Sequence, residues 1–375
     1  MSKVDTFFDT LSSHYKKQLP FVVYSRPINN IIKCWLQNDD RIITTENFSE
    51  SGFVFTPFDL EKSSILFPTE HCDFQSIEIS PDESLIQNNT SKKSQSTEVL
   101  KIQHIQLIEK ALEFINHNKF SKVVLSRNET ILLKNTDPIE LFKRLFHTYK
   151  QAMVYCWFHP KVGLWLGATP ELLFKTEGQD LTTISLAGTQ LAEKDKQPYW
   201  AKKEFEEQQI VTDYLINQTS PLTLKTQISD TESIKAGQLW HLKTRIKSRL
   251  KPEVNLKEII KILHPTPAVC GFPKDITKDF ILNNENYLRE FYTGFLGELN
   301  LKSTTQRNLN RKNIEQNAYD LVKKNSNFYV NLRCMQIKNN KALIYVGGGI
   351  TKDSIPENEW DETCNKLKTM MRILD

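Results

Sequence analysis

The chain has 375 residues, of which 39% are hydrophobic and 25% are charged, and its formal net charge at pH 7 is +4. This length allows one large domain or two ordinary ones. The small net charge gives no indication of a nucleic-acid partner, and no stretch approaches the roughly 18 unbroken apolar residues of a membrane span. The N-terminal segment carries charges among its apolar positions and makes a poor signal peptide. Six widely spaced cysteines without a CxxC pair favour reduced thiols. We therefore expect a cytoplasmic protein with neither a membrane nor a nucleic-acid partner.

A polar stretch divides the chain near its first quarter. Residues 76–97 are rich in Ser, Asn, Asp and Lys, a composition typical of a linker or an exposed loop. We expect residues 1–98 to form an N-terminal segment of the same fold that ends in this linker, and residues 99–375 to form the main body.

The main body begins with helical and strand patterns in alternation. Residues 99–116 have apolar side chains at helical spacing and predict an amphipathic helix. Residues 122–133 predict a strand, and residues 152–166 predict a hairpin. Residues 172–191 contain two further short strand patterns. Residues 202–218 again predict a helix.

The C-terminal third contains a second polar stretch, at residues 299–327, which predicts a loop whose second half could be a short helix. Residues 328–337 and 341–346 predict a hairpin around an Asn-Asn turn. A last helix is expected at residues 356–373. Hairpins outnumber strand–helix–strand crossovers, so the pattern predicts an α+β fold with large, mostly antiparallel sheets packed together and helices outside.

Two side chains have the chemistry of an acid–base pair. Lys122 begins the apolar strand pattern KVVLSR. A solvated strand end is the plain interpretation, but a lysine partly buried among apolar neighbours can act as a general base. Glu171, in GATPELLF, lies where a turn or helix start is the plain interpretation. A carboxyl group held against apolar side chains keeps its proton more readily and can act as an acid.

Glycines and an arginine mark places where an anion could bind. Gly188 follows a strand pattern in SLAGTQ, and Gly347, Gly348 and Gly349 follow another in YVGGGIT. Plain turns are one interpretation, but glycine also lets backbone N–H groups approach an anionic ligand. Arg333, in the middle of the strand pattern NLRCMQI, requires either an anion or exposure to solvent.

Two pairs of glutamates have the spacing of neighbours on a helix face. Glu204 and Glu207 are three apart on one predicted helix, and Glu359 and Glu362 are three apart on another. Each pair alone is typical of a solvated surface. Brought together, four carboxylates would repel one another unless a divalent cation lay among them, and oxygen ligands suit Mg²⁺. The residues therefore predict a site for a dianionic small molecule, a divalent metal and a base–acid pair.

Taken in order, the segments KVVLSR, GATPELLF, SLAGT, LHPTPAVCG, FYTGFLGE, LR, GGGI and EWDET resemble the motifs of the chorismate-utilising enzymes. This family includes isochorismate, salicylate, anthranilate and aminodeoxychorismate synthases. The resemblance covers residues 99–375, which it implies are the chorismate-binding catalytic domain. It implies an isomerase, an isochorismate synthase that converts chorismate to isochorismate by Mg²⁺-dependent attack of water at C2 with loss of the C4 hydroxyl. The product would enter menaquinone or siderophore biosynthesis.

The resemblance also assigns roles to single residues. Lys122 matches the lysine that activates water, and Glu171 matches the acid that protonates the departing hydroxyl. The Mg²⁺ ligands would be Glu207 and Glu362, direct or through water, with Glu204 and Glu359 as companions. The remaining matches lie around the substrate and are Gly188, Thr189, His241, Ala268, Tyr292, Arg333, Gly347, Gly348, Gly349 and Lys366.

Within the family, a lysine at position 122 and an alanine at position 187 favour water over ammonia as the nucleophile, so no glutaminase subunit is expected. Ala268 favours an isochorismate synthase over a salicylate synthase, which also eliminates pyruvate, whereas Tyr292 favours the salicylate synthase. The alternative from another class is a catalytically dead binding or regulatory homologue. We expect a monomer.

Overall fold

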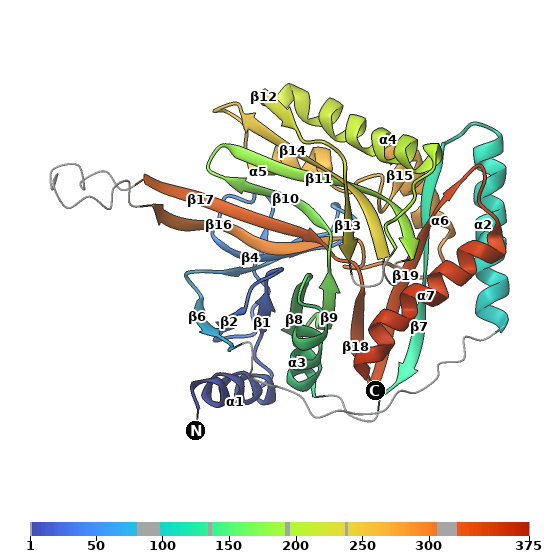
Figure 1. Cartoon of the computed structure of the whole chain (residues 1–375). Helices are drawn as coiled ribbons and strands as arrows, with labels where there is room; N and C mark the ends of the chain where they lie inside the picture. Colours follow the sequence, from blue (N-terminus) through green and yellow to red (C-terminus); the bar gives the residue numbers. More distant parts are fainter. Residues whose placement is uncertain are drawn as a thin grey trace.

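Two antiparallel sheets face each other at the centre of the molecule, and helices cover their outer sides (Figure 1). The computed structural model describes residues 2–80, 98–133, 137–191, 196–236, 239–305 and 321–374, without the side chains of nine of these residues (189, 191, 203, 207, 236, 239, 304, 305 and 321). In that part of the chain, no helix is both long and apolar enough to span a membrane.

The first sheet contains both the N-terminal strands and the strands that carry the KVVLSR and GGGI motifs. In spatial order its strands are β15 (Gly271–Phe272), β7 (Lys122–Leu132), β19 (Lys341–Thr351), β18 (Cys334–Lys338), β9 (Gly163–Thr169), β8 (Met153–His159), β1 (Phe21–Ser25), β2 (Ile31–Gln37) and β6 (Cys72–Glu78).

The second sheet likewise combines early and late strands. Its order is β12 (Thr223–Ile228), β14 (Leu239–Leu250), β11 (Asp180–Leu191), β10 (Leu172–Glu177), β17 (Leu321–Val330), β16 (Phe295–Thr305), β4 (Gly52–Thr56), β5 (Ser64–Pro68) and β3 (Thr44–Thr45), with β13 (Glu232–Ala236) also paired to β14. The first 98 residues thus contribute strands to both sheets.

The helices pack in three groups. α1 (Lys3–Lys16), α3 (Pro138–Thr148) and α7 (Pro356–Leu374) cover the outer face of the first sheet, α4 (Lys202–Thr219) and α5 (Leu256–Leu263) cover that of the second, and α2 (Glu98–Asn116) and α6 (Lys274–Asn284) pack near β7. A short 3₁₀ helix, Ser220–Leu222, follows α4.

Strand β1 shows why the central strands are apolar on both faces. Phe21 and Val23 pack under the helices outside the first sheet, whereas Val22 and Tyr24 pack between the two sheets. All five residues of β1 are buried. A strand covered on both sides needs apolar side chains at successive positions, because neither face contacts water. This two-sided burial gives the FVVYS run its composition.

The predicted fold class is confirmed, and so are several elements. The helix at 99–116 is α2, the strand at 122–133 is β7, the hairpin at 152–166 is β8 with β9, and the last helix is α7. The β18–β19 hairpin turns at Asn339 and Asn340, both with positive φ, as the Asn-Asn prediction requires.

Three expectations were wrong. Within 299–327, the described residues 299–305 and 321–327 are strand, in the β16–β17 hairpin that projects beyond the first sheet (Figure 1). In the projecting part of this hairpin, one face of the two strands is not covered by the first sheet, so polar side chains can occupy that face. Residues 76–78 belong to β6 rather than to a linker. The strand predicted at 328–337 is broken, because β17 ends at Val330 in one sheet and β18 begins at Cys334 in the other. Arg333 therefore lies in the crossing between the sheets and not in mid-strand.

Glu298 links the two sheets through a hydrogen bond and ion pairs. It lies on β16, and its carboxylate accepts a hydrogen bond of 2.8 Å from Tyr24 of β1 and forms a 2.8 Å ion pair with Lys33 of β2. Arg26 adds a contact of 3.6 Å. Burial opposes the charged form, but Lys33 and Arg26 outweigh it and lower the pKa of Glu298. A carboxyl with a lowered pKa stabilises the fold above its unfolded-state pKa, and this contribution is lost as the pH falls through the lowered value.

Replacing Glu298 by Gln should lower the free energy of unfolding at pH 7 by about 2–3 kcal/mol, because a buried partner of Lys33 and Tyr24 loses its charge. Urea unfolding of both proteins measures the difference, which should shrink toward low pH. The control is Glu232→Gln, because the exposed pair of Glu232 with Lys243 should contribute less than about 1 kcal/mol. Equal losses in the two variants would contradict a bridge between the sheets.

Candidate active site

The glycine run of β19 is the place where the predicted site residues meet. A Cβ atom added to Gly347 would lie 3.0 Å from the Tyr292 hydroxyl oxygen, and one added to Gly349 would lie 3.0 Å from Lys122 Cε. A Cβ at Gly348 would lie 3.4 Å from Glu359 Oε2. The three glycines are inside β19 and do not form a turn, which corrects the turn interpretation. They leave room for side chains from three other segments to approach the strand.

Lys122 begins β7, directly opposite Thr351 of β19. Its half-buried side chain runs beside Gly349. The strand is fixed in this register by eleven consecutive residue pairs with β19, from Lys122–Thr351 to Leu132–Lys341. The position of the lysine relative to the glycines is therefore set by backbone pairing over the whole strand.

Glu171 lies in the two-residue bend between β9 and β10. Its N–H donates to Thr169 Oγ1 at 3.3 Å, and its carbonyl accepts from the Val330 N–H at 2.9 Å. Burial raises the pKa of Glu171 to about 7, although Lys122, Arg333 and Lys366 all act to lower it. A shift of this sign keeps much of the carboxyl protonated near neutral pH. Glu171 thus holds its proton more tightly than an ordinary carboxyl although three basic side chains act on it.

Arg333 and Tyr292 form another part of the site. Arg333 adopts a left-handed backbone conformation with φ of 47°, an uncommon geometry for a residue with a side chain. Burial lowers the pKa of Arg333, against the influence of Tyr149, Glu171 and Tyr292. Tyr292 is buried, stacks on Tyr345 with 5.3 Å between ring centroids, and its pKa is raised by burial. A half-buried guanidinium near a phenol hydroxyl is suited to hold a carboxylate.

Lys366 and His241 each contact one of the glycine segments, Lys366 at Gly347 and His241 at Gly188. Lys366 donates to the Gly347 carbonyl at 2.8 Å and forms a 2.6 Å ion pair with Glu362. His241 Nδ1 lies 2.9 Å from the carbonyl oxygen of Gly188, which has a φ of 69° at an irregularity in β11. Burial lowers the pKa of His241, the hydrogen bond to Gly188 opposes this, and Arg333 and Lys366 lower it further. Arg333 and Lys366 therefore act on both His241 and Glu171.

Carboxylates from two helices approach the two glycine segments. Glu204 of α4 places its Cβ 3.5 Å from the position of a Cβ on Gly188, and its Oε2 is buried without a hydrogen-bond partner among the described residues. Glu359 and Glu362 of α7 lie on either side of the Gly348 position, at 3.4 and 4.0 Å. A buried carboxylate oxygen with no donor has the chemistry of a Mg²⁺ ligand.

The described side chains do not by themselves complete a metal site, since they include no group of three His, Cys, Asp or Glu able to hold an ion. The predicted ligand Glu207 is on α4, but its side chain lies outside the described residues, as does that of Thr189. Ala268 lies in the turn before β15 and is half-buried. The four-glutamate set therefore stays a prediction.

Sequence reasoning missed Arg127, a buried residue that fixes α7. Its Nε donates to Thr363 Oγ1 at 2.9 Å, its guanidinium carbon lies 4.1 Å from the centre of the Trp360 ring, and Nη1 forms a 2.7 Å ion pair with Glu129. Thr363 and Trp360 belong to the same turns of α7 as Glu359 and Glu362. A signal was present in the sequence, because Arg127 ends the apolar KVVLSR run and a buried arginine requires a partner.

A second buried pair, Arg289 with Glu285, was also missed. Glu285 accepts bonds of 2.8 Å from both the N–H and the hydroxyl of Ser126 on β7, and Arg289 donates to the Val124 carbonyl at 2.7 Å. The pair thus ties the segment that carries Tyr292 to the strand that carries Lys122. Its i,i+4 spacing was visible in the sequence, but such pairs are usually exposed.

Comparison with known proteins identifies the family. One family model, described as "Chorismate binding enzyme", matches residues 65–306, and a second, "chorismate binding enzyme", matches residues 319–372. The chain is 29% identical over 286 residues to isochorismate synthase DhbC of Bacillus subtilis, covering 71% of this chain and 66% of that protein. It is 27% identical over 273 residues to the salicylate biosynthesis isochorismate synthase of Pseudomonas aeruginosa, covering 70% of this chain and 53% of that protein.

The fold is similar to that of solved structures. For the 2,3-dihydroxybenzoate-specific isochorismate synthase DhbC of Bacillus anthracis, the TM-score is 0.75 at 21% identity, over 98% of this chain and 99% of that one. In the two sequence alignments, by contrast, the matched part of this chain spans less than two thirds of the length of each relative. Since a family model matches most of the chain and the family's motifs meet at one glycine face, the protein belongs to the chorismate-binding enzymes and is similar to their isochorismate synthases.

Proposed function

We propose that the protein is an isochorismate synthase that converts chorismate to isochorismate with Mg²⁺ as cofactor. The observation that carries this proposal is the half-buried carboxyl of Glu171, whose pKa is raised although Lys122, Arg333 and Lys366 act to lower it. Chorismate has two carboxylates and a C4 hydroxyl that must leave as water. A site for it needs cations for the carboxylates and a protonated acid for the leaving group.

In the proposed reaction Lys122, in its neutral amine form, takes a proton from a water molecule as the oxygen of that water attacks C2. The ring double bonds shift, the C4–O bond breaks, and Glu171 gives its proton to the departing hydroxyl, which leaves as water. One proton is gained by Lys122 and one is lost by Glu171, so exchange with solvent returns both to their starting states. Nothing is oxidised or consumed, and the product is an isomer of the substrate.

The remaining side chains bind and orient the substrate. Arg333, with the Tyr292 hydroxyl, would hold the enolpyruvyl carboxylate, because a guanidinium can form two parallel hydrogen bonds to it. Gly188 and Gly347 would offer backbone groups to the substrate. Glu204, Glu207, Glu359 and Glu362 would hold Mg²⁺. When bound, Mg²⁺ neutralises the charge of the C1 carboxylate.

A second candidate function is salicylate synthase, in which bound isochorismate also loses pyruvate. Tyr292 favours it, since a phenol hydroxyl lies beside Gly347 where some isochorismate synthases have phenylalanine. Ala268 favours the simple isomerase. The names of the sequence relatives support isochorismate formation, in one of them as part of salicylate biosynthesis. Since water is the proposed nucleophile, we propose that no glutaminase subunit takes part. We also propose that the protein is a cytoplasmic monomer.

Lys122→Ala should lower kcat by at least about 10²-fold, because the water loses its base, while chorismate binding in the presence of Mg²⁺ stays largely intact. Turnover and equilibrium binding are measured separately. The control, Lys110→Ala, removes an exposed lysine of α2. Turnover of the Lys122 variant at the wild-type rate would remove this residue from the mechanism.

Glu171→Gln should also lower kcat by about 10²-fold or more, because glutamine cannot donate a proton to the leaving hydroxyl. In the wild-type enzyme the rate should fall as the pH rises through about 7, where Glu171 loses its proton.

Stability gives an independent test of this pKa. The folded protein holds the Glu171 proton between the unfolded-state value near 4.5 and about 7, so wild-type stability falls as the pH rises across this window. The gain in melting temperature of Glu171→Gln over wild type should therefore be larger at pH 8 than at pH 5. If the difference in melting temperature does not depend on pH, the pKa of Glu171 is not raised in the folded protein.

The two candidate reactions differ in one product. Incubation with chorismate and Mg²⁺ should give isochorismate without pyruvate, as measured by chromatography, and EDTA should abolish turnover. Stoichiometric pyruvate and salicylate would identify the second candidate instead. Absence of any turnover at saturating Mg²⁺ would contradict both.

A further inference from the structure

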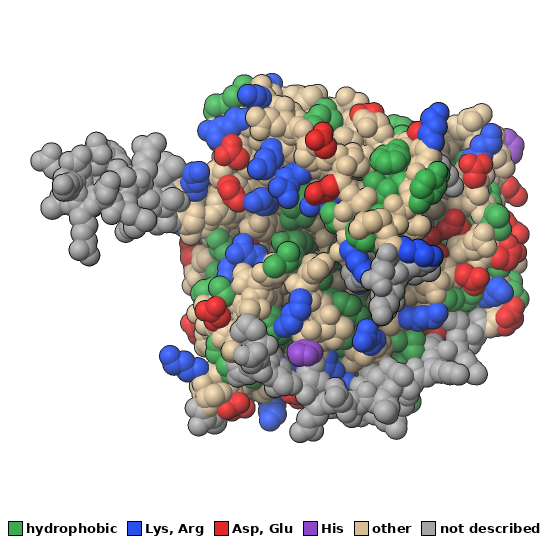
Figure 2. Space-filling model, in the orientation of Figure 1, with side chains coloured by type: hydrophobic (Ala, Val, Ile, Leu, Met, Phe, Trp, Pro, Cys, Tyr) green, Lys and Arg blue, Asp and Glu red, His purple; other side chains and the backbone are tan. Residues whose placement is uncertain are grey.

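Buried residues and basic residues alternate along strand β14 from Leu242 to Leu250. Leu242, Thr244, Ile246, Ser248 and Leu250 are all buried. The positions between them are Lys243, Arg245, Lys247 and Arg249, and they project from the other face of the strand. This face carries four cations in a row. Figure 2 shows Lys and Arg side chains gathered over this part of the second sheet.

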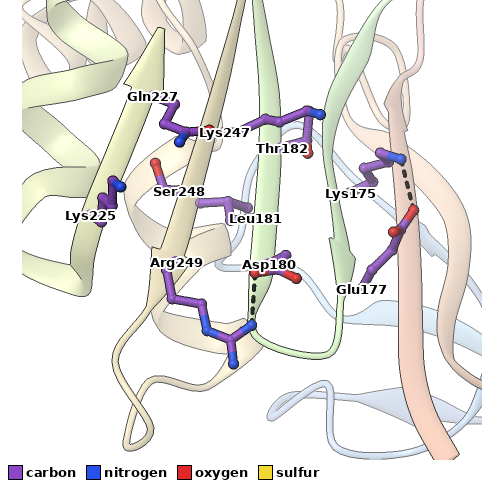
Figure 3. Close-up of a pocket in the computed structure, with 10 residues that line it drawn as sticks. All are labelled: Lys175, Glu177, Asp180, Leu181, Thr182, Lys225, Gln227, Lys247, Ser248 and Arg249. Carbon is purple, nitrogen blue, oxygen red and sulfur yellow. Dashed lines mark hydrogen bonds and ion pairs between the residues drawn. The ribbon is translucent and has the colours of Figure 1, made fainter. Parts of the chain in front are cut away.

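The far end of this face is hollowed. A groove of about 330 Å³ lies across β10, β11, β14 and β12 (Figure 3). Its lining residues are Lys175, Glu177, Asp180, Leu181, Thr182, Lys225, Gln227, Lys247, Ser248 and Arg249.

Strand register arranges the charged residues of the groove in two cross-strand rows. In the first row Lys175 is opposite Thr182, which is opposite Lys247, which is opposite Gln227. Every side chain in this row carries a hydrogen-bond donor, and none is acidic. In Figure 3 the Lys247 side chain extends toward Thr182. The first row is therefore complementary to an anion.

The second row contains the acidic residues, and they are already paired. Glu177 forms a 2.8 Å ion pair with Lys175, and Asp180 forms one of 2.8 Å with Arg249 (Figure 3). Lys225 and Lys247 form no ion pair within the described residues, so the groove has two cations in excess. Both of the existing pairs are exposed, and such pairs are weak enough for Lys175 and Arg249 to contact an incoming anion as well.

The groove is separate from the candidate active site. Lys247 follows His241 by six residues on β14, which corresponds to about 20 Å of extended strand. An anion in the groove therefore cannot contact Glu171, Arg333 and the glycine run at the same time. The groove is also large enough for a small molecule rather than for a single bound water or ion.

We propose that this groove is a second binding site, for small anions that carry two negatively charged groups. One group would be held by Lys175, Thr182 and Lys247, and the other by Lys225 and Arg249. Dicarboxylates and diphosphates share this chemistry. The site does not depend on the proposed reaction, because no active-site residue takes part in it.

The test uses calorimetric titration of the full chain with inorganic pyrophosphate and, separately, with malonate, at low salt and without substrate, after metal ions have been removed on a chelating resin. The test variant is the double substitution Lys225→Gln with Lys247→Gln. The control is Lys110→Gln with Lys119→Gln, which removes the same charge from exposed positions in and after α2. Melting temperatures establish that both variants are folded.

We expect saturable binding of at least one anion to the wild-type protein. Affinity should fall at least about tenfold in the groove variant and less than about twofold in the control, because each lost ammonium removes a charge-assisted hydrogen bond. The preferred probe identifies the ligand as a dicarboxylate or a diphosphate. The proposal would be overturned if neither probe showed saturable binding. It would also be overturned if the groove variant and the control bound the anion with equal affinity, because the anion would then bind elsewhere on the protein.

Discussion

The close approach of side chains to the glycine run of β19 is the constraint on which the site depends. At Gly347 and Gly349 an added Cβ would lie 3.0 Å from the Tyr292 hydroxyl and from Lys122 Cε, closer than most such contacts in proteins. At Gly347 it would also lie 2.7 Å from the Leu125 carbonyl oxygen. Any larger residue would displace a neighbouring strand or a functional side chain. The glycines serve here by their lack of volume, and not by a left-handed backbone conformation.

Two buried ion pairs hold the elements around this run. Arg127, paired with Glu129 of its own strand, joins β7 to α7 through Thr363 and Trp360. Arg289 and Glu285 join the segment before Tyr292 to β7. Buried pairs add little to stability compared with apolar packing, but losing one partner is costly because the other charge is left buried. Their value here is positional. Both pairs contact the strand that Lys122 begins, and so they fix the positions of Lys122, Tyr292 and α7 relative to one another.

The electrostatics of the site are decided by the competition at Glu171. Three cations act to lower the pKa of its carboxyl, yet burial raises it from 4.5 to about 7. Removal from water therefore outweighs three nearby positive charges. The result is a carboxyl that keeps much of its proton near neutral pH while basic side chains lie close to it. The cationic groove at the end of β14 instead offers exposed lysine side chains.

The sequence by itself determined the family, the α+β class and most of the residues that meet at the glycine run. Lys122, Glu171, Gly188 and Gly347 stand in motifs whose order is readable without coordinates. Local periodicity also predicted α2, α7 and the β8–β9 hairpin, since each has a pattern that depends only on neighbouring residues.

Only the tertiary structure decided what depends on distant segments. Arg333 looked like a strand residue because its neighbours are apolar, but the chain crosses between sheets there. The polar β16–β17 hairpin looked like a loop because part of it has no covering sheet. Arg127 and Arg289 gained their partners from segments more than 100 residues away, and the groove formed from strands whose register no local pattern specifies. Pairing between remote strands and helices is set by the whole core, and for this reason it could not be inferred one segment at a time.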